Sequence, residues 1–234
     1  LNEAGVPEGV INLVNGDGPT LGGWLLPDER IAGVSFTGSH PSARVINRQL
    51  ALRDGPIIPL IAETGGINCM VVDSTALPEQ VVDDVITSAF RSAGQRCSAL
   101  RVLFVQSDVA DGIIELLAGA MKELVVGDPH KLSTDVGPVI DQAAHDRISA
   151  HLMHLKETAT FIAKSPSADP KLNGYFVEPQ AWEISSLSAL HEEVFGPVLH
   201  IVRYHSEELD TIIKDIRSSK FALTMGIHLS LIHI

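Results

Sequence analysis

Short apolar runs alternate with stretches that carry helix start and stop signals, and this alternation constrains the fold more than any other feature. The first part of the chain contains three such runs, which predict strands at 10–14, 31–36 and 57–62. Pro19 and Pro41 suit the first turns of the helices between them, which we expect to end near Leu25 and Leu52. A β-α-β-α-β order predicts a parallel sheet with crossover helices.

The rest of the chain continues the alternation and predicts an α/β fold throughout. We expect strands at 67–72, 100–106, 175–177 and 198–204. We expect helices at 78–93, 109–124, 141–160 and 207–217. The glycine pair Gly65-Gly66 interrupts the pattern and predicts a domain boundary, and residues 165–173 predict an exposed loop.

Composition excludes several classes of function. With 45% hydrophobic residues among 234, the chain can bury a sizeable core, and its formal net charge of −12 argues against nucleic acid or anionic membrane surfaces as partners. Two cysteines, Cys69 and Cys97, do not make a disulfide framework and favour a reducing compartment such as the cytoplasm. We expect no transmembrane segment, since the sequence holds no apolar run of about 18 residues.

Cys97 is the strongest candidate for a catalytic residue. It lies in Ser-Ala-Gly-Gln-Arg-Cys-Ser, between a predicted helix and a predicted strand. A lone cysteine is most often a small buried hydrophobe, but the polar neighbours here favour a nucleophile, and Arg96 would help its thiolate to form. Cys69 lies within an apolar strand, so we expect it in the core.

Two strand ends carry further candidates. Glu63 follows an apolar strand, where it is either a solvated terminus or a general base whose pKa burial has raised. The glycine pair after it suggests that the backbone comes close to a ligand. Gly38-Ser39 joins a strand to a helix, a place where free N–H groups bind anions.

Two other patterns favour structural roles. Gly16-x-Gly18 differs from the dinucleotide fingerprint and predicts a turn. His145, His151 and His154 share one predicted helix, but their spacing does not converge on one ion. We therefore expect surface histidines and no metal site.

Three motifs in order carry a family resemblance: Ala-Glu-Thr-Gly-Gly at 62–66, Gly-Gln-Arg-Cys-Ser at 94–98 and Glu-Val-Phe-Gly-Pro at 193–197. With this spacing, residues 1–228 resemble the aldehyde dehydrogenase superfamily. Within it, the segments AETGGIN, GQRCSALR and GIH are most similar to the L-glutamate gamma-semialdehyde (pyrroline-5-carboxylate) dehydrogenase module of bacterial proline utilisation A.

The resemblance implies the catalytic roles. Cys97 would be the nucleophile that attacks the aldehyde to give a thiohemiacetal, and hydride transfer to the nicotinamide would then leave a thioester. The oxyanion would be held by the Cys97 backbone N–H and an upstream asparagine. Glu63 would be the base that activates water for hydrolysis. Arg96 and Ser98 would bind the carboxylate of the substrate.

The resemblance also implies NAD as the cofactor. Glu193 would bind the nicotinamide ribose, Phe195 would lie beside the nicotinamide, and Gly38 with Ser39 would contact the pyrophosphate. The implied reaction is the oxidation of glutamate semialdehyde to glutamate, the second step of proline breakdown. Two alternatives stay open: another semialdehyde dehydrogenase of the superfamily, for example one for succinate semialdehyde, or an inactive fragment.

The implied fold is the C-terminal part of a Rossmann-like parallel-sheet cofactor domain followed by an α/β catalytic domain, truncated at both ends. Accordingly we expect a partial NAD-binding domain at 1–64, a catalytic domain at 65–228 and a non-native tail at 229–234. The full-length form is expected to be a homo-oligomer, with a flavin-dependent proline dehydrogenase domain fused to it. We expect little activity from the isolated chain, since the family's oxyanion asparagine and anchor loop are absent from it.

Overall fold

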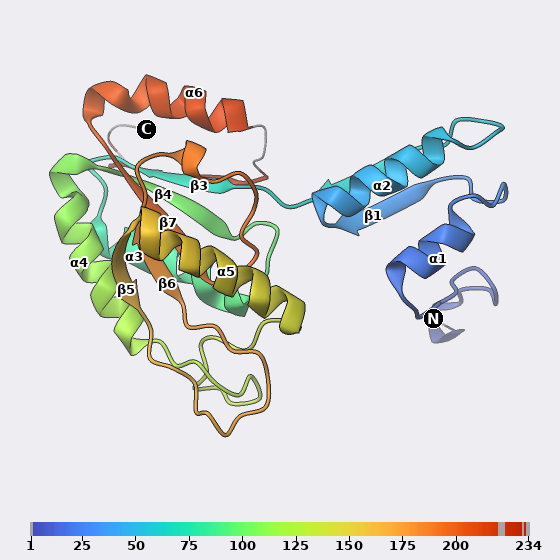
Figure 1. The fold of residues 1–234 in the computed structure, drawn as a ribbon, viewed down its shortest axis with the longest axis horizontal. Coiled ribbons are helices and arrows are strands. Elements are labelled where there is room, and N and C mark those ends of the chain that lie inside the picture. The colour runs from blue at the N-terminus through green and yellow to red at the C-terminus, as the bar shows by residue number, and fades with distance from the viewer. Residues whose placement is uncertain (1, 220–222, 231, 233–234) are drawn as a thin grey trace. The chain divides into compact units, whose positions relative to one another are not determined.

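A computed structural model describes residues 2–219, 223–230 and 232 of the chain. These residues divide into two compact units, Leu1–Thr64 and Gly65–Ile234, which are drawn together in Figure 1. In the described part of the chain, no helix combines the length and apolar character that a membrane crossing requires.

The first unit is built on two parallel strands joined by a helix. Its elements are η1 (Asn2–Ala4), α1 (Gly18–Leu25), β1 (Val34–Gly38), α2 (His40–Ala51) and β2 (Leu60–Thr64). Asp17 caps α1 by accepting the Thr20 backbone N–H at 3.0 Å. β1 and β2 lie in parallel register, with α2 as the crossover between them. The predicted helices and the parallel pairing are confirmed, although both strands begin about three residues later than expected.

The predicted strand at 10–14 is wrong. These residues form bends and irregular backbone, and Leu13 is 87% exposed. A strand is stable only when a neighbour accepts its hydrogen bonds and an apolar layer covers one face. Within the described first unit, β1 and β2 pair with each other and leave the 10–14 run without a partner strand.

The second unit contains a six-stranded sheet in the order β5-β6-β7-β4-β3-β8. The strands are β3 (Asn68–Val72), β4 (Leu100–Gln106), β5 (Thr160–Lys164), β6 (Gln180–Glu183), β7 (Val198–Tyr204) and β8 (Met225–His228). All neighbours are parallel except β5, which runs antiparallel at the edge. Every residue of β3 and β4 is buried, as expected for parallel strands covered on both faces.

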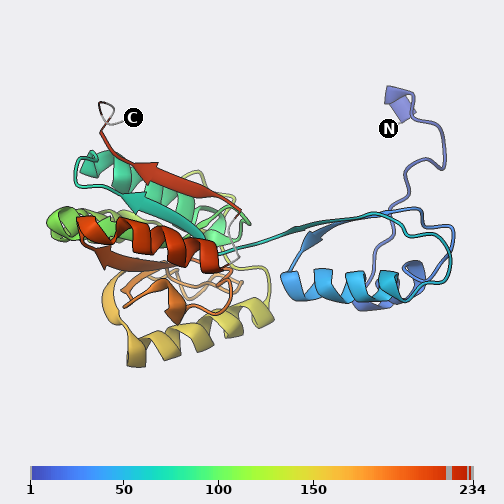
Figure 2. The same cartoon turned by 90° about the horizontal axis from the view of Figure 1, so that it is seen from above.

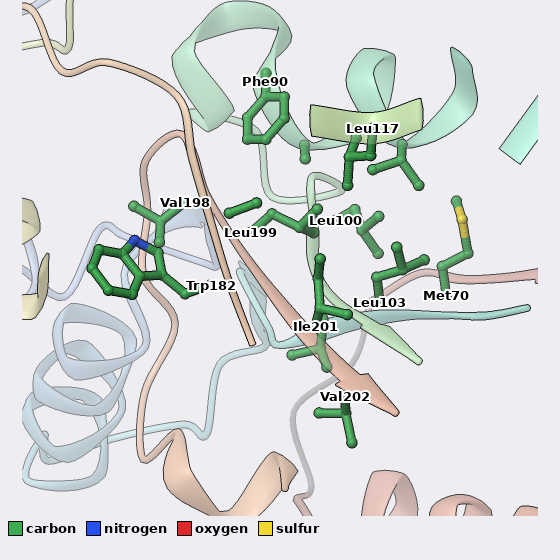
Figure 3. Packing of buried hydrophobic residues seen from close by; sticks show 14 of the residues in the cluster. Met70, Phe90, Leu100, Leu103, Leu117, Trp182, Val198, Leu199, Ile201 and Val202 are labelled. Atoms are coloured by element: carbon green, nitrogen blue, oxygen red, sulfur yellow. The ribbon is translucent and has the colours of Figure 1, made fainter. Parts of the chain in front are cut away.

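Helices cover both faces of this sheet. They are α3 (Pro78–Phe90), η2 (Arg91–Gly94), α4 (Ser107–Glu123), α5 (Gln142–Thr158), η3 (Leu187–Ala189), η4 (Ser206–Glu208) and α6 (Leu209–Ser219). α3 and α4 pack side by side against β4 and β7, and α6 lies on the opposite side of the sheet (Figures 1 and 2). Between them, Phe90 and Leu117 from the helices meet Leu103, Leu199 and Ile201 from the strands (Figure 3).

The sequence located the long elements of this unit and missed the short ones. β4 and β7 have the predicted bounds, and Cys69 is buried in β3 as expected. The predicted strand at 175–177 is wrong, because Tyr175 makes only an isolated bridge to Val139. The short strands β5, β6 and β8 were not predicted, since they are partly exposed and lack the continuous apolar run of β3.

The loop predicted at 165–173 is confirmed. Part of the tail expected at 229–234 lies outside the described residues, namely Leu231, His233 and Ile234. Ser230 is described, and its backbone N–H donates to Thr75 Oγ1 at 3.0 Å.

Candidate active site

Cys97 lies on a tight turn between η2 and β4 and carries an exposed, free thiol. The turn begins with three consecutive residues in the left-handed region, Ser92, Ala93 and Gly94, at φ of 57°, 53° and 65°. A left-handed conformation costs a residue with a Cβ about 1–2 kcal/mol. Such a turn therefore persists only where its surroundings fix it.

A buried arginine fixes the upstream half of this turn. Arg101, near the start of β4, is 1% exposed, and its guanidinium donates to the carbonyls of Gly94 at 2.7 Å and Arg96 at 3.1 Å. The same guanidinium donates to the Gly196 carbonyl at 3.2 Å and to Glu193 Oε1 at 2.9 Å. One side chain thus joins the nucleophile turn to the Glu-Val-Phe-Gly-Pro motif.

A buried asparagine fixes the downstream half. Asn68, the first residue of β3, donates through Nδ2 to the carbonyls of Cys97 at 2.7 Å and Ala99 at 2.9 Å. Its Oδ1 accepts the backbone N–H groups of Leu223 and Thr224, each at 2.9 Å. All the hydrogen-bonding groups of this side chain are used, so the amide orientation is determined by the network.

The Glu193 carboxylate is held on two sides and remains 19% exposed. Arg101 binds one oxygen, and the backbone of Gly65 lies so close to the other that a Cβ there would overlap it. The close approach predicted for the glycine pair is therefore made by Glu193, a protein side chain. The Phe195 ring lies beside the same guanidinium, with its centroid 5.3 Å from the Arg101 Cζ.

Electrostatics favours an ionised pair at this point. Burial lowers the pKa of the Arg101 guanidinium, and its hydrogen bond and ion pair with Glu193 work in the opposite direction. An arginine stays protonated in proteins, so a buried guanidinium requires acceptors for its N–H groups. The three carbonyls and one carboxylate around Arg101 provide them.

Arg96 and Ser98, on either side of Cys97, line one hollow of about 730 Å³. The Arg96 guanidinium donates to the carbonyls of Thr87 at 2.7 Å and Ser88 at 3.2 Å, at the C-terminal end of α3. Its Nε is buried and has no hydrogen-bond partner among the described residues. The hollow therefore has a mixed polar and apolar lining, which includes both the Arg96 guanidinium and the Asp84 carboxylate.

In the first unit, the structure brings Gly38, Ser39 and Glu63 to one edge of the β1–β2 sheet. Thr37 is opposite Glu63 in the parallel register, so both strands end at the same edge. Ser39 caps α2 by accepting the Ser42 N–H at 3.3 Å. Ligands of parallel sheets bind at this carboxyl edge, and the exposed Glu63 carboxylate is available there.

The predicted residues thus form two groups, one in each unit. The second unit gathers five of them around Arg101 and Asn68: Arg96, Cys97, Ser98, Glu193 and Phe195. Arg101 and Asn68 were not predicted. The available signal was a charged or amide side chain inside an otherwise apolar strand, in Leu-Arg-Val-Leu-Phe-Val and Ile-Asn-Cys-Met-Val-Val.

The prediction that the α5 histidines are surface residues is wrong for His151. Its Nε2 lies 2.8 Å from Nε2 of His200, a fully buried residue of β7. His200 Nδ1 donates to the Arg101 carbonyl at 2.9 Å, so its Nε2 accepts from His151. Burial lowers the pKa of His200 to about 3 and that of His151 to about 4, and both rings are neutral at physiological pH.

Comparison with known proteins decides the family. The model of the aldehyde dehydrogenase family matches residues 1–230. The chain belongs to this family. The match includes the turn of Cys97, the Glu193 motif and the glycine pair that faces it.

Two curated members of the family illustrate the similarity. The bifunctional protein PutA of Klebsiella aerogenes is 50% identical over 236 residues, which cover 97% of this chain and 18% of that protein. The 1-pyrroline-5-carboxylate dehydrogenase of Bacillus cereus (strain B4264) is 34% identical over 229 residues, which cover 96% of this chain and 44% of that protein. The chain therefore spans about a fifth and somewhat under half of the length of these relatives.

A solved structure confirms the fold. A crystal structure of a bifunctional proline utilisation A (PutA) protein superposes with a TM-score of 0.93 at 54% identity, over 97% of this chain and 23% of that one. The α/β class and the aldehyde dehydrogenase fold predicted from the sequence are confirmed.

Proposed function

We propose that this chain contributes the catalytic centre of an NAD-dependent dehydrogenase that oxidises L-glutamate gamma-semialdehyde to L-glutamate, the second step of proline catabolism. The observation that carries the proposal is the exposed Cys97 thiol on a turn held from both sides and joined through Arg101 to Glu193. The names of the PutA and 1-pyrroline-5-carboxylate dehydrogenase relatives support the choice of substrate.

Cys97 begins the reaction. Its thiolate attacks the aldehyde carbon, a carbon–sulfur bond forms, and the carbonyl oxygen becomes an oxyanion held by the Cys97 backbone N–H. The fixed carbonyls of Cys97 and Ala99 keep the turn, and with it the thiol, in one position during this step. NAD, when bound, would supply the acceptor for the hydride, and the acyl group would remain on Cys97 as a thioester.

Glu63 completes the reaction as the general base. It takes a proton from water, the resulting hydroxide attacks the thioester carbonyl, and the carbon–sulfur bond breaks to release glutamate and the Cys97 thiolate. In support of this role, Glu63 is exposed at the carboxyl edge of the first unit, beside the start of α2. We assign residues 1–64 to part of the NAD-binding domain and residues 65–228 to the catalytic domain.

The residues present fit NAD. A carboxylate that is fixed at one oxygen and partly exposed can accept hydrogen bonds from both hydroxyls of a ribose, and Glu193 has this arrangement. Phe195 is 44% exposed and offers a flat apolar surface next to it. Gly38 and Ser39 lie directly before the N-terminus of α2, where the helix dipole suits a pyrophosphate.

Arg96 and Ser98 would select an aldehyde that carries a carboxylate. Both are neighbours of Cys97 in the sequence and line the same hollow, where a guanidinium and a hydroxyl can donate to an anion. Hydrogen bonds to a charged group contribute about 1.5–3 kcal/mol, so losing one should raise KM roughly 10- to 100-fold. The same chemistry would accept succinate semialdehyde, which makes that aldehyde the appropriate competitor.

The test is NADH formation by the natural gene product that carries this sequence, with glutamate semialdehyde, succinate semialdehyde and propionaldehyde as substrates. We expect the highest kcat/KM for glutamate semialdehyde. The Cys97→Ala variant should abolish oxidation with little change in NAD affinity, whereas Cys69→Ala, a matched change of a buried thiol, should retain activity.

The Ser98→Ala variant separates the substrate assignment from the reaction type. It should raise KM for glutamate semialdehyde and leave KM for propionaldehyde unchanged, because propionaldehyde has no carboxylate. A higher kcat/KM for succinate semialdehyde would reject the proposed substrate, and oxidation by Cys97→Ala would reject the proposed nucleophile.

A further inference from the structure

Arg101 has an arrangement that fold stability does not explain. Its guanidinium is buried within a strand of apolar residues and binds four acceptors from two separate segments. A buried ion pair is often no more stabilising than well-packed hydrophobic residues of similar volume. What this guanidinium adds is a fixed geometry between the two segments that it joins.

The donors of Arg101 are shared between those segments. Nη2 donates both to the Arg96 carbonyl and to Glu193 Oε1, and Nη1 donates both to the Gly94 carbonyl and to the Gly196 carbonyl. Because a guanidinium is planar and rigid, one acceptor pair cannot shift without moving the other. A displacement of Glu193 is thus transmitted to the peptide that precedes Cys97.

The surroundings leave Arg101 and Glu193 little freedom to move independently. Gly65 closes one side of the carboxylate, and the Phe195 ring lies beside the guanidinium. The Arg101 backbone is held as well, since its carbonyl accepts from the buried His200 ring. A displacement of the Glu193 carboxylate therefore moves the Arg101 guanidinium, and through it the turn that carries Cys97.

We propose that Arg101 is a positioning residue that couples the occupancy of Glu193 to the reactivity of the Cys97 thiol. It touches neither substrate nor cofactor, and it acts through Glu193 on one side and the Arg96 carbonyl on the other. The proposal rests on the proposed function for the ligand of Glu193, a ribose diol. Coupling of this kind is reciprocal, so the state of the thiol also changes the affinity for that ligand.

The experiment measures the rate of Cys97 alkylation by iodoacetamide in the natural gene product, first without cofactor. The variants are Glu193→Gln, Arg101→Lys, Arg101→Met and the double variants. We expect Glu193→Gln to change the alkylation rate at least threefold when Arg101 is present and less than 1.5-fold in the Arg101→Lys or Arg101→Met background. Arg203→Lys is the matched control, because Arg203 of β7 binds Glu183 of β6 and Asp111 of α4 and makes no hydrogen bond to the turn.

The second part adds saturating NAD. In the unchanged protein NAD should alter the alkylation rate, and in Arg101→Lys this effect should fall at least fivefold while NAD still binds. Arg101→Lys keeps the positive charge and hydrogen-bond donors, so it carries the test if Arg101→Met fails to fold. If Glu193→Gln changes the Cys97 alkylation rate equally with and without Arg101, the coupling is overturned. If the alkylation rates behave as expected but the protein forms no NADH, the proposed function alone is overturned.

Discussion

Asn68→Leu is the most informative single substitution, because Leu has the branched shape of Asn but makes no hydrogen bonds. The change removes two donors from the Cys97 and Ala99 carbonyls and one acceptor from the Leu223 and Thr224 N–H groups. Each hydrogen bond contributes about 1 kcal/mol net, so the four together amount to about 4 kcal/mol. We expect this loss to be centred on the backbone groups that Asn68 binds, with additional crowding because the Leu methyl groups are larger than the amide.

Native-state hydrogen exchange measures the loss where it occurs. The Leu223 and Thr224 amides should exchange as unprotected groups, because their acceptor is gone. The Ala99 amide, which donates to the Arg96 carbonyl at 3.0 Å, should exchange up to about a thousandfold faster, since 1.4 kcal/mol corresponds to a factor of ten. kcat should fall with the loss of a fixed thiol position.

The matched control is Asn173→Leu, which makes the same chemical change at an exposed loop position. It should leave exchange in residues 94–100 unchanged. If Asn68→Leu exposes the Leu223 and Thr224 amides but leaves Ala99 as protected as before, then Asn68 does not hold the turn and the reasoning is refuted.

Three further outcomes follow from the same geometry. Iodoacetamide should label the exposed Cys97 and spare Cys69, whose burial raises its thiol pKa to about 12; peptide mass spectrometry measures this, and equal labelling would contradict it. The buried His200 has a folded pKa of about 3 against about 6.5 unfolded, so it should lower stability by about 1.4 kcal/mol per pH unit as pH drops from about 6.5 toward 4. In urea unfolding, His200→Phe should lose this contribution and keep the contribution of the same sign that His151 makes, and an unchanged slope would contradict the assignment. Gly65→Ala should weaken NAD binding at least tenfold in a fluorescence titration, because its Cβ would displace Glu193, and unchanged affinity would argue against the role of that carboxylate.

The sequence predicted the central elements of the second unit because their burial leaves a clear pattern. β4 and β7 are seven-residue apolar strands, and their bounds were predicted correctly. The 10–14 run has the same apolar pattern and forms no strand, because strand formation depends on a neighbour that local sequence does not specify. The pattern of apolar residues thus shows that a segment can be buried. Whether the segment forms a strand depends on pairing with a neighbouring strand.

In the candidate site, too, some residues could be predicted from the sequence and others could not. Cys97, Glu63 and Glu193 stand in motifs that a linear sequence displays, so they were predicted as candidates, and their roles stay predictions. Arg101 and Asn68 act through contacts to segments distant in sequence, and a local pattern shows them only as polar residues in apolar strands. Which carbonyls they hold depends on the sheet order β7-β4-β3-β8, which only the structure supplies.

The two side chains that fix the nucleophile turn also set when it can form. Glu193 lies 92 residues after Arg101, and Thr224 lies 156 residues after Asn68. At a synthesis rate of about 5–20 residues per second, roughly 8 to 30 s separate the emergence of Asn68 from that of Thr224. Until then the strained turn lacks its full set of hydrogen bonds, so the nascent chain carries an ordinary thiol, and reaction geometry is among the last features that folding completes.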